Sequence, residues 1–264
     1  MDASSPILLF DTGVGGLTVL AELRKVLPNA PVIYAADYAG LPYGTKTEAE
    51  VAARVCGLLG RMSERYQPRA ICIACNTAST IALGMVREVL EVPIIGTVPA
   101  IKPAAAMTET GVIGLLGTAA TVRQPYVDRL EAEFASDTVL IRFAASGLVD
   151  LAEAKLRGET VGTNSLRAEV RALLEAENAD RIDTLVLACT HFPLLEEELL
   201  QVFGPQVRMV HGAEGIARRI AAVTHGQQFA RTTPDRFITT GSAKDAADLA
   251  HCLSQYGLDS IEAF

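Results

Sequence analysis

Two short stretches of the sequence each end in reactive side chains. Residues 70–80 read AICIACNTAST, and residues 184–195 read TLVLACTHFPLL. The apolar run in each stretch predicts a short buried strand. A cysteine with hydrogen-bonding neighbours then follows: Cys75 with Asn76 and Thr77 in the first stretch, and Cys189 with Thr190 and His191 in the second. Because open α/β sheets bind ligands beyond the carboxyl ends of their strands, each stretch predicts half of a ligand site.

Two cysteines that face each other across a cleft could invert a carbon stereocentre without a cofactor. One thiolate would remove a proton from carbon, and the opposite thiol would deliver a proton to the other face. Cys75 and Cys189 both precede predicted helices, whose N-terminal dipoles would favour the thiolate. His191 could pair with one thiol, and Asp11, at the end of the first predicted strand, could assist the other. The amide and hydroxyl neighbours would hold carboxylates by hydrogen bonds.

Other chemistries of these residues are weaker hypotheses. Cys72 and Cys75 form a C-x-x-C spacing, which redox and zinc sites use, and Cys189 and His191 could complete a zinc site. Strand positions three apart face opposite sides, so Cys72 is expected to point into packing. The glycines at 13, 15 and 16 do not form the dinucleotide fingerprint, and Lys102 lacks the context of a Schiff-base lysine. We therefore predict neither metal nor cofactor.

The composition sets the broad class of the protein. The chain has 264 residues, half of them hydrophobic, no Trp, and a net charge of −8, which argues against a general nucleic-acid binder. No early stretch reads as a signal peptide and no run approaches membrane-spanning length, so the sequence predicts a cytoplasmic protein without membrane association. Its five cysteines should then stay reduced. Cys56 and Cys252, in predicted helices, are expected to be inert.

The elements that carry these residues alternate between strand and helix. This alternation predicts an α/β fold with parallel sheets and right-handed crossovers. Strands are expected near residues 7–10, 32–35, 69–74, 92–96, 111–116, 139–142, 185–188, 207–210 and 237–239. Helices are expected near residues 17–27, 45–66, 77–90, 122–134, 148–157, 163–177, after Pro193, before 223, and at 243–253.

The order of these elements repeats within the chain. Residues 7–23 correspond to 112–130, and residues 70–80 correspond to 184–194, which indicates a duplicated α/β unit. The small-residue turn after the fifth strand, with Thr118 and Thr121, corresponds to the turn that begins at Asp11. We expect both threonines just behind the site. Residues 99–103 mark a crossing between lobes, and the tail is expected to return to the first lobe.

Six motifs together resemble a known family. They are FDTGVGGLTV (10–19), PYG (42–44), ACNTAS (74–79), GLLGTAATV (114–122), LACTHFPLL (187–195) and GIARR (215–219). In this order they are similar to the glutamate racemases of the aspartate/glutamate racemase group. The stretch LAEAKLRGE (151–159) is similar to the proteobacterial branch.

The resemblance implies cofactor-independent conversion of L-glutamate to D-glutamate for peptidoglycan, and hence a role in cell-wall biogenesis and cell shape. Cys75 would abstract the proton from the D-isomer and Cys189 from the L-isomer, assisted by Asp11 and His191. The implied substrate-binding residues are Asp11, Thr12, Tyr43, Gly44, Asn76, Thr77, Thr190 and His191. The implied fold is two lobes related by pseudo-twofold symmetry, with the active site between them. The first lobe would comprise residues 1–97 and 207–264, and the second residues 98–206.

The chain departs from the family pattern at a few positions, and several alternatives stay open. Thr12 replaces a usual Ser, Asp150 stands for a family Glu, and His211-Gly212 replaces Asp-Ser. The resemblance names a muramyl-peptide nucleotide activator as a candidate partner and leaves monomer and homodimer open. An aspartate or other acidic amino-acid racemase, a one-thiol decarboxylase, and a zinc-binding or redox module are the competing functions.

Overall fold

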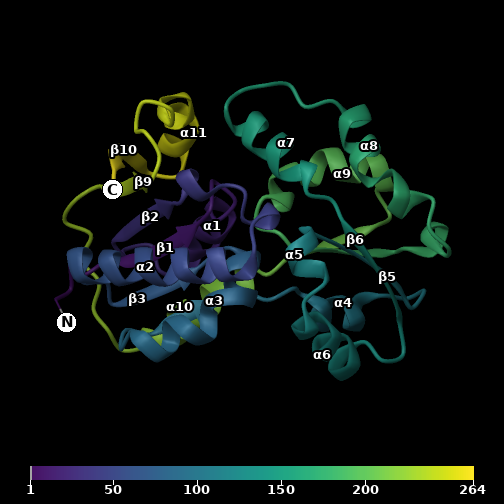
Figure 1. Cartoon of the computed structure of the whole chain (residues 1–264), viewed down its shortest axis with the longest axis horizontal. Helices are drawn as coiled ribbons and strands as arrows, with labels where there is room; N and C mark the ends of the chain where they lie inside the picture. The colour runs from purple at the N-terminus through teal and green to yellow at the C-terminus, as the bar shows by residue number, and fades with distance from the viewer. Residues whose placement is uncertain (1) are drawn as a thin grey trace. The chain divides into compact units, whose positions relative to one another are not determined.

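The computed structural model describes residues 2–264, which divide into two compact units. Unit 1 comprises Met1–Thr97 and Ala213–Phe264, and unit 2 comprises Val98–Gly212. Each unit is a parallel sheet flanked by helices (Figure 1), as the predicted fold class requires. The second unit extends beyond residue 206, where we expected it to end, because the strand Arg208–Val210 hydrogen-bonds to a strand of unit 2.

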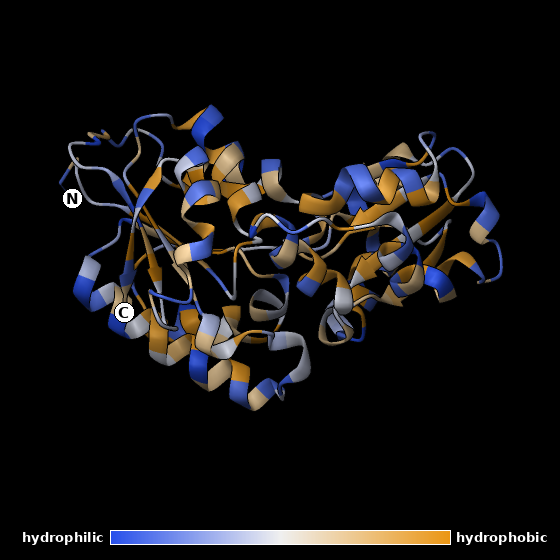
Figure 2. Cartoon of the chain, turned by 90° about the horizontal axis from the view of Figure 1, so that it is seen from above, coloured by the Kyte–Doolittle hydropathy of each residue, from blue (hydrophilic) through white to orange (hydrophobic). Residues whose placement is uncertain are grey.

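Unit 1 contains a six-stranded sheet in the order β10-β9-β2-β1-β3-β4, and every neighbouring pair is parallel. The three central strands are buried on both faces, as expected for a parallel sheet covered by helices. Figure 2 shows the strands as largely apolar, while the helices alternate between apolar and polar faces. The strands are β1 Ile7–Asp11, β2 Val32–Ala36, β3 Ala70–Ile73, β4 Ile94–Gly96, β9 Asp235–Thr239 and β10 Leu258–Ala263.

Two pairs of helices pack against each other in unit 1. Helices α1 and α10 contact each other, as do α2 and α3, whose apolar residues share a buried cluster with one face of the sheet. Helix α2 begins at a capping box in which Thr47 and Glu50 exchange hydrogen bonds. The helices are α1 Leu17–Val26, α2 Glu48–Tyr66, α3 Asn76–Val89, α10 Ala213–Val223 and α11 Ala250–Gln255, with short 3-10 turns η1 Tyr38–Gly40, η2 Tyr43–Thr45 and η5 Ala247–Leu249.

Unit 2 contains a four-stranded parallel sheet in the order β6-β5-β7-β8. Its buried cluster joins β5 and β7 to the helices α4, α5 and α6. The strands are β5 Val112–Gly117, β6 Val139–Ala144, β7 Thr184–Leu187 and β8 Arg208–Val210. The helices are α4 Ile101–Met107, α5 Ala119–Val122, α6 Pro125–Phe134, α7 Gly147–Leu156, α8 Thr163–Leu174 and α9 Glu196–Phe203, with 3-10 turns η3 Ala179–Arg181 and η4 Phe192–Leu195.

The two sheets share one plan, as the internal repeat predicts. The order β2-β1-β3-β4 in unit 1 matches β6-β5-β7-β8 in unit 2. The residue before each cysteine makes the same bond, because Ala74 N–H donates to Phe10 O and Ala188 N–H donates to Leu116 O, both at 2.7 Å. Cys75 and Cys189 therefore occupy equivalent positions in their own units.

A second pair of backbone bonds extends this correspondence. Asp37 N–H donates to Asp11 O at 2.8 Å, and Ala145 N–H donates to Gly117 O at 2.9 Å. Asp11 and Asp37 of unit 1 thus correspond to Gly117 and Ala145 of unit 2. The frame is duplicated, but its side chains are not.

Three predicted elements differ from the structure. Residues 101–107 form helix α4, where the prolines suggested only a crossing segment. The C-terminal helix begins at Ala250 rather than near residue 243. Residues 258–263 form the edge strand β10, which the sequence did not reveal because half of its residues, LDSIEA, are polar and most are only partly buried or exposed.

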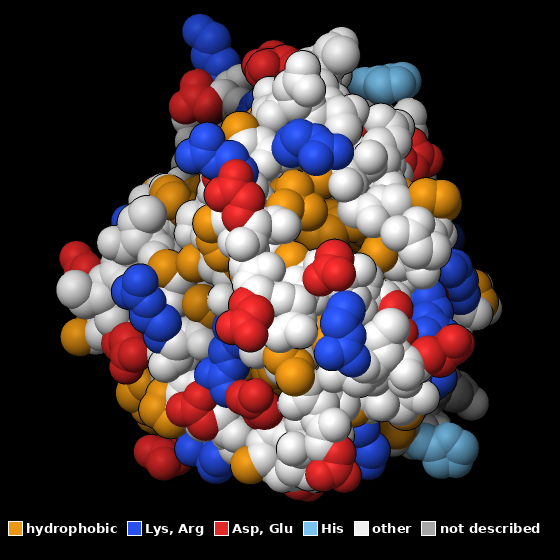
Figure 3. Space-filling view, turned by 90° about the vertical axis from the view of Figure 1, so that its right-hand side faces the viewer, with side chains coloured by type: hydrophobic (Ala, Val, Ile, Leu, Met, Phe, Trp, Pro, Cys, Tyr) orange, Lys and Arg blue, Asp and Glu red, His pale blue; other side chains and the backbone are white. Residues whose placement is uncertain are grey.

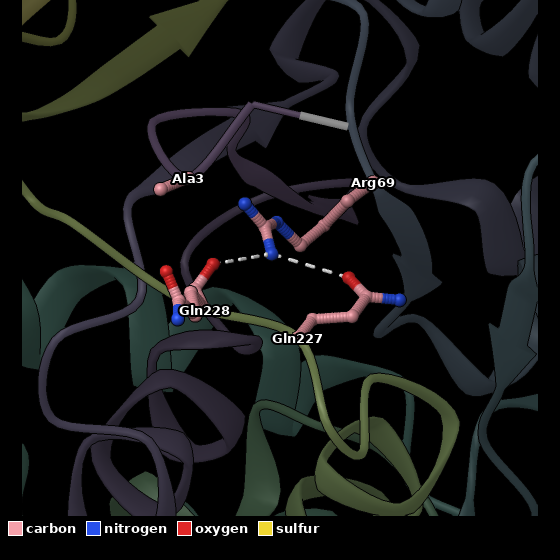
Figure 4. A pocket seen from close by; sticks show the side chains of 4 residues that line it. All are labelled: Ala3, Arg69, Gln227 and Gln228. Atoms are coloured by element: carbon pink, nitrogen blue, oxygen red, sulfur yellow. Dashed lines mark hydrogen bonds between the residues drawn. The ribbon is translucent and has the colours of Figure 1, made fainter.

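Arg69 ties distant segments of unit 1 together at the start of β3. Its guanidinium donates to the side chain of Gln227 and to the carbonyl oxygen of Gln228 (Figure 4). It also donates to the carbonyl oxygens of Asp2 and Ser5. The residue is buried, so these carbonyl oxygens replace the water that its charge would otherwise require.

The distribution of surface charge and the character of the helices can be compared with those of nucleic-acid-binding and membrane proteins. On the face shown in Figure 3, acidic and basic side chains are interspersed rather than gathered into a basic patch. Within residues 2–264, no helix combines the length and the apolar character needed to cross a bilayer.

Candidate active site

Cys75 lies at the N-cap of helix α3, directly beyond strand β3. The peptide N–H of Ala78 points at its sulfur, with 3.5 Å between nitrogen and Sγ. An N–H donor and the positive end of a helix dipole both favour a thiolate over a thiol. Cys75 is buried with 6% of its surface exposed, so this N-terminus acts on it with little screening by water.

Asp11 is the last residue of β1, and Thr12, which follows it, lies beside Cys75. The Asp11 carboxylate accepts hydrogen bonds from the N–H of Thr12 at 2.7 Å and of Gly16 at 2.5 Å. The Thr12 hydroxyl oxygen lies 4.0 Å from the Cys75 sulfur. These two backbone amides of the glycine-rich turn thus donate to the Asp11 carboxylate. A side chain at Gly16 would come within 2.9 Å of the Tyr34 hydroxyl, so glycine is needed there.

The remaining predicted residues of unit 1 surround the start of α3. Asn76 and Thr77 occupy its first turn and are buried, and the Thr97 hydroxyl donates to the Asn76 side-chain oxygen. That bond leaves the Asn76 amide group free to orient its N–H donors elsewhere. Tyr43 is buried in the same cluster as Cys75, while the neighbouring Gly44 is half-buried.

The Tyr43 hydroxyl has a partner within the protein. It donates to the Asp37 carboxylate across 2.5 Å. Burial, followed by the negative charge of Asp37, raises the pKa of Tyr43 far above its usual value. Tyr43 therefore stays protonated, and its proton is committed to Asp37.

In unit 2, Cys189 lies beyond strand β7 and next to His191. The Cys189 sulfur is 4.0 Å from Nδ1 of His191, and Nε2 of His191 is 3.0 Å from a carboxylate oxygen of Glu153. A carboxylate at Nε2 favours the tautomer that carries its proton there, which leaves Nδ1 as an acceptor toward the thiol. This arrangement can take a proton from Cys189 or return one to it.

The structure corrects one expectation for unit 2 and identifies an acidic residue that the motifs did not indicate. Cys189 does not cap an α-helix, because the 3-10 turn η4 follows it and helix α9 begins only at Glu196. The helix-dipole argument therefore applies to Cys75 alone. The carboxylate of α7 that reaches the site is Glu153, whereas Asp150, one turn earlier, is exposed to solvent. Both are acidic residues of one helix, and burial distinguishes them.

The other predicted residues of unit 2 follow strands β5 and β7. Thr190 is buried between Cys189 and His191. Thr118 caps the short helix α5 by accepting from the Thr121 N–H, and the two hydroxyl oxygens are 3.0 Å apart. These threonines stabilise the turn beyond β5.

Cys72, the other cysteine of the C-x-x-C spacing, lies apart from Cys75 in the packing. Cys72 is fully buried and lies outside the cluster that contains Cys75, as the strand alternation predicts. Burial, followed by the charge of Asp11, raises the pKa of the Cys72 thiol. All five cysteines are free thiols. Within residues 2–264, no group of three or more His, Cys, Asp or Glu side chains is arranged to hold a metal ion.

Comparison with known proteins bears directly on this arrangement. Residues 18–220 match the family Asp/Glu/Hydantoin racemase. The chain belongs to this racemase family. The resemblance drawn from the sequence motifs is thereby confirmed.

Relatives of the racemase family match the chain over nearly its whole length. A glutamate racemase of Sphingopyxis alaskensis is 57% identical over 259 residues, covering 98% of this chain and 97% of the relative. A glutamate racemase of Salmonella typhimurium is 42% identical over 258 residues, covering 97% of this chain and 90% of the relative. The crystal structure of Escherichia coli glutamate racemase in complex with L-glutamate and the activator UDP-MurNAc-Ala has a TM-score of 0.92 and 40% identity, with 98% of each chain covered.

Proposed function

We propose that the chain is a glutamate racemase that interconverts L- and D-glutamate without a cofactor and supplies D-glutamate for peptidoglycan. The family supports the reaction class, since its members are racemases. Glutamate is favoured as the substrate by the 57% identical relative and by the E. coli structure with bound L-glutamate. A substrate panel including aspartate tests the alternative of another acidic amino acid.

Cys75 and Cys189 are the proposed acid and base. With L-glutamate, the Cys189 thiolate takes the α-proton, and the electron pair left on the α-carbon delocalises into the carboxylate. The Cys75 thiol then gives its proton to the opposite face, which produces D-glutamate and leaves Cys75 as the thiolate. The reverse reaction begins from that state, so no oxidant, reductant or co-reactant is required.

Each thiol has a different assistant in this proposal. Cys75 is served by the N-terminus of α3 and by the adjacent Asp11 and Thr12, whereas Cys189 is served by His191, oriented by Glu153. Substrate would be held by hydrogen bonds from the buried polar groups that follow the strands, which are charge-assisted toward carboxylates. The proposed set is Asp11, Thr12, Tyr43, Gly44, Asn76, Thr77, Thr190 and His191.

The observation that carries the proposal is the equivalence of the two cysteines. Matching 2.7 Å backbone bonds hold Ala74 and Ala188, the residues before them, in their own sheets. A duplicated frame that retains a thiol at the same point of both copies suits a reaction that treats two mirror-image substrates alike.

The decisive experiment follows the α-hydrogen and the optical rotation of glutamate in deuterated water. Starting from either enantiomer, the rotation should decay while deuterium enters the α-position. Cys75→Ala and Cys189→Ala should each abolish racemisation, and Cys56→Ala, which removes a thiol on α2, should be fully active. Full activity in both active-site variants would end the proposal, whereas stoichiometric zinc in the purified protein would favour a metal-binding module.

Two further aspects belong to the proposal. We also propose a reducing cytoplasm as its location, where the two proposed catalytic thiols would stay reduced. UDP-MurNAc-Ala, present in the E. coli structure, is the candidate activator, and its addition should raise kcat/KM if it acts on this chain. Unchanged rates with the nucleotide would remove it from the proposal.

A further inference from the structure

Asp37 is the centre of a buried hydrogen-bond network beyond the end of strand β2. Its side chain is completely buried. One carboxylate oxygen accepts from Nε of Arg54 and from the Tyr43 hydroxyl, and the other accepts from Nη2 of Arg54, at 2.6 Å, and from the Thr240 hydroxyl. Four hydrogen bonds to one carboxylate, two of them from a bidentate arginine, fix the orientation of the Asp37 side chain.

This network joins three segments that are far apart in the sequence. Arg54 lies on helix α2, Tyr43 lies in the turn η2, and Thr240 follows strand β9. The Thr240 hydroxyl also accepts from the Ala39 N–H at 3.1 Å, so the loop is held at a second point. The loop between β2 and α2 is therefore tied both to the helix that follows it and to a strand from residues 213–264.

The network lies next to the proposed acid/base residue of unit 1. The N–H of Asp37 donates to the carbonyl oxygen of Asp11. The Asp11 carboxylate accepts from the N–H of Thr12, whose hydroxyl oxygen lies 4.0 Å from the Cys75 sulfur. Tyr43 belongs to the same buried cluster as Cys75, and negative charge on Cys75 is a smaller cause of the raised pKa of Tyr43, after burial and Asp37. A displacement of Asp37 would thus be transmitted to the groups around Cys75.

Gly40 shows how little space the network leaves. A Cβ atom at Gly40 would lie 2.4 Å from the Asp37 carboxylate, 2.5 Å from Nε of Arg54 and 2.8 Å from the Tyr43 ring. All three neighbours are fixed by their mutual hydrogen bonds, so none can easily move aside. Glycine at this position is what lets the loop close over the carboxylate.

We propose that Asp37 is a positioning residue that, through Tyr43 and Arg54, holds the loop at residues 42–45 in place beside Cys75 for glutamate binding. The inference rests on the proposed function and adds a residue that neither the motifs nor the family match points to. Because the hydroxyl proton of Tyr43 is committed to Asp37, Tyr43 does not donate that proton to substrate. The corresponding position in unit 2 is Ala145, so only the Cys75 side has this support.

The test compares two buried aspartates that lie next to opposite ends of strand β2. Asp235 accepts from the N–H of Val32, the first residue of β2, and pairs with Arg24, while Asp37 follows the last residue of β2. Asp37→Asn and Asp235→Asn each leave an arginine without its carboxylate, so both should lower the unfolding temperature. Only Asp37 lies beside the proposed site, which makes Asp235→Asn the matched control.

Kinetics and binding separate positioning from stability. Asp37→Asn should raise KM for both enantiomers, and Kd for glutamate by calorimetry, on the order of tenfold with little change in kcat. Tyr43→Phe keeps the ring and removes only the hydroxyl, so it should shift both constants in the same direction even if Asp37→Asn does not fold. Asp235→Asn should keep the wild-type constants.

Hydrogen exchange supplies a readout that does not depend on substrate. Amides of residues 38–46 should exchange faster in Asp37→Asn and Tyr43→Phe than in Asp235→Asn. Equal changes in KM for Asp37→Asn and Asp235→Asn, or wild-type KM and exchange in Tyr43→Phe, would overturn the inference. If the wild type neither binds nor racemises glutamate, the proposed function fails. Separately, unaltered hydrogen exchange at residues 38–46 in Asp37→Asn would show that Asp37 does not hold the loop.

Discussion

Replacing Glu153 with Gln isolates the charge that orients His191. Gln has nearly the same shape, so the imidazole keeps a neighbour while the negative charge 3.0 Å from its Nε2 is removed. His191 is 2% exposed and Glu153 is 7% exposed, so water cannot substitute for the carboxylate. A hydrogen bond to a charged group contributes about 1.5–3 kcal/mol. Since about 1.4 kcal/mol corresponds to tenfold in rate, we expect kcat/KM to fall roughly ten- to hundredfold.

The loss must be the same in both directions. Two enantiomers have equal free energies, so the ratio of kcat/KM for L-glutamate to that for D-glutamate stays at unity in every variant of a true racemase. Circular dichroism with each pure enantiomer measures both values and so checks the assay itself. The exposed Asp150 on the same helix provides the control, and Asp150→Asn should match the wild type.

A Glu153→Gln variant with wild-type kcat/KM would refute the reasoning. So would an equal loss in Asp150→Asn, because the effect would then come from the charge of α7 as a whole. Glu153 also pairs with Arg157, at 3.9 Å, and Arg157 is partly exposed, so thermal unfolding should change little in Glu153→Gln. A large fall in unfolding temperature would make the kinetic result uninformative about His191 and would itself contradict this expectation.

Two further predictions concern one residue in each unit. Thr12→Val removes the hydroxyl near the Cys75 sulfur and should lower kcat/KM by up to about tenfold, which corresponds to the free energy of a neutral hydrogen bond. Thr12→Ser keeps the hydroxyl and should remain active. Equal rates in the two variants would contradict this prediction. Asp183, at the start of β7, has its pKa held well below 3.8: burial opposes this shift, but hydrogen bonds from Thr108, Thr184 and two backbone amides outweigh it. The stability that the ionised Asp183 contributes is fully present above pH 3.8 and is lost as the pH falls toward the folded-state pKa. Asp183→Asn should therefore unfold at a lower temperature than the wild type at pH 7. The difference between the two unfolding temperatures should narrow at pH 3. A difference that is independent of pH would contradict the second prediction.

Much of the fold could be predicted because parallel strands buried on both faces leave a strong signal. The runs that became β1, β3, β5 and β7 are continuous and apolar, and each ends at a glycine- or cysteine-containing turn. Strand β10 escaped detection because an edge strand with one open side needs few apolar residues. Helix α4 was missed because its Pro103 resembles a break in a short segment, although proline is tolerated in the first turn of a helix.

Some residues of the candidate site could likewise be predicted from the sequence, and others could not. The two cysteines and their neighbours follow strands directly, so local sequence was enough to find them. Glu153 and Asp37 were not recognised, because their importance depends on partners such as His191, 38 residues away, and Thr240, 203 residues away. Burial of a carboxylate and the identity of its donors are properties of the folded chain, and no local pattern encodes them.

The return of residues 213–264 to unit 1 has a consequence for folding during synthesis. Strand β9 pairs with β2, so β2 has an unpaired edge until residue 239 has been made. Unit 2, whose strands are all contained in residues 112–210, can be completed well before that point. Exposed strand edges invite pairing with other chains, which makes the interval before β9 arrives the period of greatest aggregation risk on the ribosome.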